Sequence, residues 1–104
     1  MTAAPVACFL VASVWDCWEP GGVPRAGAMT WRRHDAPASD PEPRPMPHLS
    51  VMTPAGLVCL DCPETGGTGH WDRQGDPPRV TAIPSLNVNH GTWHGWLTDG
   101  RLVA

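Results

Sequence analysis

The chain has 104 residues and a formal net charge of −3, with seven Arg, no Lys, 13 Pro, 11 Gly, six Trp and four Cys. This length limits it to one small domain, or to a smaller module with a tail, and excludes a long coiled coil, a membrane bundle and a large enzyme. A protein that binds a phosphate backbone needs clustered cations, and the one adjacent basic pair here is Arg32-Arg33. The composition therefore disfavours nucleic-acid binding.

The first 35 residues show no sustained helical or strand period. Their apolar run from Val6 to Val14 is far shorter than the roughly 20 residues that cross a bilayer, and no positive charge precedes it as in a secretory signal. We therefore expect a cytoplasmic, reduced protein without membrane contact, in which residues 1–35 form a low-structure N-terminal extension. An accompanying hypothesis is that the native protein starts near Met46, so that the preceding residues are a misassigned start.

A proline-rich segment occupies residues 36–47, where Pro41, Pro43, Pro45 and Pro47 alternate with other residues. Each proline fixes φ and lacks a backbone donor, so that neither a helix nor a central strand can form here. The pattern predicts an extended, polyproline-like linker. A ligand for a domain with an aromatic groove is the alternative interpretation.

Residues 48–104 carry the period-two patterns and turn residues of short strands. The predicted strands cover residues 48–53, 57–60, 79–83, 86–88, 92–97 and 101–103. Thr98-Asp-Gly100 predicts a hairpin between the last two strands, because glycine adopts the positive φ that such a turn requires. The predicted fold class is therefore mostly β. It is a small antiparallel β module of hairpins over 48–104, preceded by a disordered or poorly structured N-terminal segment.

A module of this size gains little stability from its core alone, and a metal, a disulfide or a partner usually helps. Cys59 and Cys62 have the C-x2-C spacing of zinc ligands, and His90 and His94 complete a Cys2His2 set. His70 is the alternative histidine ligand. The spacing thus predicts a structural zinc ion. Two reduced thiols, a redox pair or a disulfide are the other interpretations of the two cysteines.

No sequence motif of a known catalytic site is present: the chain lacks H-E-x-x-H, G-x-S-x-G, a P-loop and G-x-G-x-x-G. His70 and Asp72 would share one face of a strand and, with His94, could leave a metal position open for hydrolysis. Three ordinary polar residues are a weak signal for catalysis. The chain is therefore predicted not to be an enzyme.

Trp71, Trp93 and Trp96 form the aromatic set of the predicted β module. Tryptophans in a small β protein most simply build the core, and the alternative is a binding surface for another molecule. We keep these three residues as the candidate binding surface, with a protein as the expected partner.

The C-terminal part resembles small uncharacterised proteins of phages and prophages in high-GC actinobacteria. The resemblance covers about residues 46–104 and rests on Cys59-Leu-Asp-Cys62-Pro63 and on Trp93-His-Gly-Trp-Leu-Thr-Asp-Gly100. A broader domain-of-unknown-function group has a similar plan. Many of its members carry a further cysteine just before the histidine of the terminal hairpin, and residues 89–93 of this chain contain none. The resemblance implies a phage accessory protein and brings no established activity. The resulting hypothesis is a protein-binding β module, with a minor virion or assembly component and a metal-dependent hydrolase as alternatives.

Overall fold

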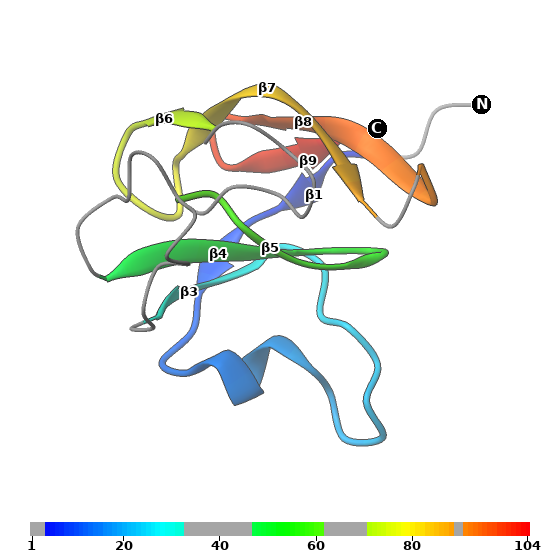
Figure 1. The fold of residues 1–104 in the computed structure, drawn as a ribbon. Coiled ribbons are helices and arrows are strands. Elements are labelled where there is room, and N and C mark those ends of the chain that lie inside the picture. Colours follow the sequence, from blue (N-terminus) through cyan, green and yellow to red (C-terminus); the bar gives the residue numbers. More distant parts are fainter. Residues whose placement is uncertain (1–3, 33–46, 62–70, 89–90) are drawn as a thin grey trace, which may run out of the picture.

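The computed structural model describes residues 4–32, 47–61, 71–88 and 91–104, and two β-sheets pack face to face in it (Figure 1). One sheet has five strands in the order β1-β9-β8-β7-β6, and the other has four in the order β2-β3-β4-β5. The five-stranded sheet contains β1 (Val6–Ala7), β9 (Arg101–Val103), β8 (Trp93–Thr98), β7 (Thr81–Val88) and β6 (Asp72–Gln74). The four-stranded sheet contains β2 (Phe9–Leu10), β3 (Ala28–Arg32), β4 (His48–Thr53) and β5 (Gly56–Cys59). All neighbouring strands are antiparallel except β2 and β3.

The predicted mostly β, antiparallel fold class is confirmed, and two predicted hairpins are present. In the β4–β5 turn, the Thr53 hydroxyl donates to the carbonyl of Gly56 at 2.7 Å and accepts from the Ala55 amide at 3.2 Å. In the β8–β9 turn, Asp99 and Gly100 have φ values of 45° and 75°. Both central residues therefore adopt the left-handed region that a two-residue hairpin needs.

Residues before the proline-rich segment are part of both sheets, which differs from the low-structure extension expected over residues 1–35 and from a module that begins at 48. β1 pairs with β9, and β3 pairs with β4 through Met29 and Val51. The chain passes from one sheet to the other at Cys8, whose amide donates to the carbonyl of Gly100 at 2.8 Å. Strands as short as β1 and β2 leave no period in the sequence, so that only their tertiary pairing reveals them.

The main hydrophobic core lies between the two sheets. Its buried members are Met29, Leu49, Val51, Leu60, Trp71, Val80, Ala82, Leu86, Val88, Leu97 and Leu102. Strand alternation explains the set, since every second residue of β4 and β8 faces the opposite sheet. Met29 comes from the segment that was expected to lack structure, so the core needs both parts of the chain.

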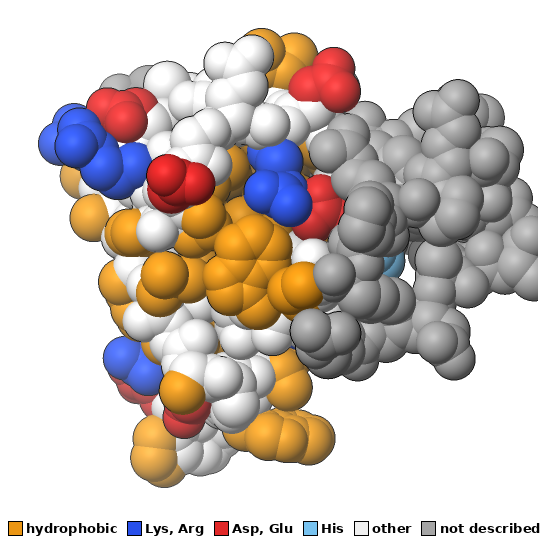
Figure 2. Space-filling model, turned by 90° about the vertical axis from the view of Figure 1, so that its left-hand side faces the viewer, with side chains coloured by type: hydrophobic (Ala, Val, Ile, Leu, Met, Phe, Trp, Pro, Cys, Tyr) orange, Lys and Arg blue, Asp and Glu red, His pale blue; other side chains and the backbone are white. Residues whose placement is uncertain are grey.

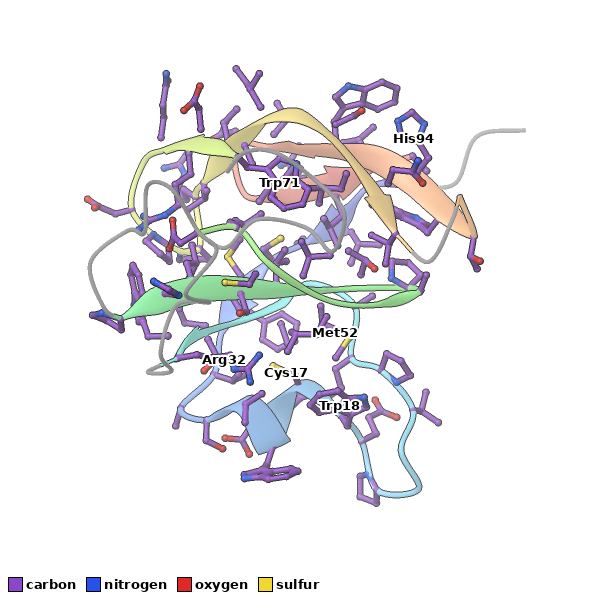
Figure 3. The ribbon with its side chains drawn as sticks, viewed as in Figure 1. Cys17, Trp18, Arg32, Met52, Trp71 and His94 are labelled. Carbon is purple, nitrogen blue, oxygen red and sulfur yellow. The ribbon has the colours of Figure 1, made fainter. Side chains whose placement is uncertain are left out.

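A second, smaller core covers the other face of the four-stranded sheet. It contains Cys17, Ala28 and Met52, packed against Phe9, Val11, Trp18 and Leu57. Cys17 belongs to the short 3-10 helix η1 (Val14–Cys17), which lies below this sheet together with the segment that follows it (Figures 1 and 3). The fold thus has a third, thin layer.

No helix in the described part of the chain is long and apolar enough to cross a membrane. The predicted linker over 36–47 lies outside the described residues except for Pro47, and its extended conformation remains a prediction.

Candidate functional site

The predicted metal ligands are only partly described. Cys62, His70 and His90 lie outside the described residues. Cys59 is the half-buried last residue of β5 in the four-stranded sheet, and His94 is an exposed residue of β8 in the five-stranded sheet.

Cys59 and His94 face opposite sides of the molecule. Val58 and Leu60 pack in the core between the sheets, so that strand alternation directs Cys59 to the outer face of its sheet. His94 lies on the outer side of the five-stranded sheet (Figure 3). The structure therefore does not bring these two predicted ligands together, and the described residues contain no group of three or more His, Cys, Asp or Glu side chains that could hold a metal ion.

His94 instead pairs with Ser85. Its Nε2 lies 2.8 Å from the Ser85 Oγ, and its ring centroid is 5.4 Å from that of Trp96. Asp72, the carboxylate of the alternative hydrolase arrangement, is an exposed residue of β6, which β7 separates from the His94 strand β8. An exposed histidine on an open sheet face lacks the water-excluded surroundings that a catalytic pair needs.

The three tryptophans expected to form a binding surface have different environments. Trp71 is 7% exposed and lies between the sheets, where its Nε1 donates to the carbonyl of Ser85 at 3.3 Å (Figure 3). Trp93 packs against the same core, and Trp96 is 49% exposed. A surface made of all three is therefore not present, and Trp96 is the most exposed of the three.

A groove beside η1 offers a different aromatic site, which the sequence interpretation did not include. Its volume is about 780 Å³. The groove is lined by Trp15, Asp16, Trp18, Glu19, Pro20, Gly22 and Arg25. Trp15 is 81% exposed, whereas Trp18 is half-buried against the second core. Hydrophobic side chains also protrude at this lower end of the molecule in the view of Figure 2.

Backbone hydrogen bonds hold the groove in shape. The Glu19 amide donates to the carbonyl of Val23 at 2.8 Å, and the Gly22 amide donates to the carbonyl of Glu19 at 3.0 Å. The Arg25 amide returns the chain to η1 by donating to the carbonyl of Cys17 at 2.8 Å. Because Cys17 is fully buried under the four-stranded sheet, the turn is anchored to the core.

The charged side chains that line the groove differ in the contacts that they make. Arg25 lies over the Phe9 ring, 5.2 Å from the centroid, and its Nη1 donates to the carbonyl of Asp16 at 2.9 Å. Asp16 accepts from the Ser13 amide at 3.1 Å. Within the described residues, the Glu19 carboxylate has no ion pair. The groove is therefore lined by two carboxylates and one guanidinium, and neither carboxylate is in an ion pair within the described residues.

Burial affects the thiol beneath the groove. Cys17 lies between Asp16 and Trp18 in sequence, and burial, followed by the negative charge of Asp16, raises its pKa. The thiol is therefore neutral at physiological pH and acts as part of the second core rather than as a nucleophile.

Comparisons with protein-family models, with curated proteins and with solved structures give no match to this chain. The sequence contained one signal of the groove, since Trp15 and Trp18 have few branched aliphatic residues near them with which to form a core. Nothing in the spacing indicated that Pro20 and Arg25 would complete the same site.

Proposed function

We propose that this protein is a small protein-binding β module and that the groove beside η1 is its contact surface. The observation that carries the proposal is the 81% exposure of Trp15 next to a second tryptophan in an anchored groove. Aromatic side chains supply much of the binding energy of protein interfaces, and they do so in concave, preorganised sites. The resemblance to phage proteins supports a role as an accessory factor that binds a host or phage protein.

The exposed apolar side chains of the five-stranded sheet are the competing surface. Ile83 and Trp96 are 56% and 49% exposed there. They lie on neighbouring strands of one sheet face, whereas Trp15 and Trp18 line a groove. We therefore favour the groove and use Trp96 as the matched control.

The proposal is tested by affinity capture from a lysate of a high-GC actinobacterium with the wild type, Trp15→Ala and Trp96→Ala. The expected result is a retained protein that the wild type and Trp96→Ala both bind and that Trp15→Ala loses. Far-UV circular dichroism verifies that the variants are folded, which the exposure of both tryptophans predicts. A protein retained equally by all three would overturn the assignment of the groove.

A further inference from the structure

We infer that the ligand of the groove is a proline-rich segment in polyproline II conformation that carries a basic residue. This inference rests on the proposed function and specifies its ligand. Three properties of the groove support it: its aromatic lining, its indole donors without a partner in the described residues, and its negative charge.

The apolar surface consists of flat rings. Trp15, Trp18 and Pro20 line the groove, and their rings offer contact area with few rotatable bonds. Polyproline II helices are bound in aromatic-lined grooves because their conformation is already formed, so that binding costs little conformational entropy. An amphipathic helix, in contrast, needs a long apolar groove that accepts side chains one and two turns apart.

The hydrogen-bond donors of the groove also suit the acceptors of a polyproline II segment. No hydrogen bond from the indole N–H of Trp15 or Trp18 is found within the described residues. An indole N–H is a donor only. A polyproline II segment has carbonyl groups without internal partners and, at each proline, no backbone donor. Each of the two lining tryptophans thus retains a donor that a ligand carbonyl can use.

The negative charge of the groove favours a ligand that carries a basic residue. The Glu19 carboxylate has no ion pair within the described residues, and Arg25 is directed toward Phe9 and the carbonyl of Asp16. A guanidinium group of the ligand can pair with Glu19 and also stack on an indole face. An acidic peptide would instead bring like charges together.

The test is a fluorescence and calorimetric titration of the full chain with the synthetic peptide Ala-Pro-Pro-Arg-Pro-Pro-Arg-Pro. We expect saturable binding that Trp15→Ala weakens about tenfold or more, as for a central aromatic contact. Glu19→Gln weakens it about two- to fivefold, and added salt reduces this difference. Trp15→Phe keeps the ring but removes the N–H, so an intermediate loss is expected. Trp96→Ala binds like the wild type.

Two control peptides separate the contribution of the preformed polyproline II helix from that of the positive charge. A peptide with alanine at every proline keeps the charge and loses the preformed helix, and we expect at least a fivefold weaker complex. A peptide with glutamate at both arginines tests the charge and should bind least. Equal affinity for all three peptides, or no binding of the proline-arginine peptide, would overturn the inference. If that failure occurs while Trp15-dependent capture from lysate persists, the proposed function stands with a different ligand.

Discussion

The carboxylate of Asp61 and the guanidinium of Arg73 join the two sheets through an ion pair, with 2.8 Å between Oδ1 and Nε. Asp61 follows the end of β5 and is fully buried, and its Oδ2 accepts from the Leu49 amide at 2.8 Å. Arg73 extends from β6, and its guanidinium lies 5.3 Å from the centroid of the Trp31 ring on β3. One carboxylate thus connects the cation of one sheet to the backbone of the other.

Asp61→Ala is expected to destabilise the protein by about 3 kcal/mol, because it leaves a partly buried guanidinium and a buried amide without their acceptor. Asp61→Asn keeps an acceptor for the Leu49 amide and is expected to cost less. Urea unfolding provides the measurement. The control is Arg79→Ala, which removes an exposed pair with 3.7 Å between Arg79 and Asp99 and should change stability by less than about 1 kcal/mol. Equal effects of the two alanine variants would contradict this account.

Ser50→Ala is expected to stabilise the protein by about 1 kcal/mol. The Ser50 Oγ is buried, and it has no hydrogen-bond partner in the described part of the chain. An unsatisfied buried hydroxyl costs free energy that alanine removes at nearly the same volume. Thr53→Ala is the matched control, since it removes a hydroxyl that makes two bonds in the β4–β5 turn and should destabilise by about 1 kcal/mol. Thermal unfolding of both variants gives the sign, and a destabilised Ser50→Ala would refute the prediction.

Stability should fall as the pH rises from 9 toward 11. Burial raises the pKa of the Cys8 thiol from 9.0 to about 11. In this interval the unfolded chain releases the thiol proton and the folded protein keeps it, so rising pH favours unfolding. The chain has no Lys and no Tyr, so few other groups titrate in the same range.

Cys8→Ala tests this assignment. The wild type should lose about 2 kcal/mol more unfolding free energy between pH 8 and pH 10.5 than this variant. Burial also raises the pKa of Cys17, so both proteins keep part of the dependence of the unfolding free energy on pH. Parallel pH profiles for the wild type and Cys8→Ala would show that Cys8 is not responsible.

The C-x2-C spacing predicts about one zinc ion per chain, and the structure limits which histidines can complete the site. Because Cys59 and His94 face opposite sides of the molecule, we expect His94→Ala to retain the metal. Cys59→Ser should reduce the zinc content to less than about 0.2 per chain. Metal analysis of the purified full chain measures both. A folded wild type without metal would refute the zinc prediction, and loss of zinc from His94→Ala would refute the placement of His94.

A variant that lacks residues 1–45 is expected not to fold cooperatively. It would lose β3, which pairs with β4 over four residue pairs, and it would lose Met29 from the core. Met29→Ala alone should cost about 2–5 kcal/mol, as for other buried large side chains. Near-UV circular dichroism and urea unfolding test both changes. An unfolding midpoint of residues 46–104 equal to that of the full chain would support a module that begins at 48 instead.

Local patterns were sufficient to predict the C-terminal strands. Alternation predicted β4, β5, β8 and β9, and the Asp99-Gly100 turn predicted the last hairpin, because period and turn chemistry are local properties. The lack of a sustained helical period after residue 47 also indicated a mostly β module. The class of fold and the positions of these four strands were therefore determined by the sequence alone. β6 (Asp72–Gln74) was not predicted, and the continuous strand β7 (Thr81–Val88) was predicted as two strands over 79–83 and 86–88.

Tertiary structure decided the rest of the fold and the candidate site. The two-residue strands β1 and β2 are defined only by their partners β9 and β3, and no period could reveal them. The face on which a tryptophan lies depends on which sheet covers it, so Trp71 is buried while Trp15 is exposed. The sequence predicted a small β protein with many tryptophans and prolines. Only the packing of Cys17 and Trp18 onto the outer face of the four-stranded sheet determined where the groove beside η1 lies, because that second core includes Met52, which is distant in the chain.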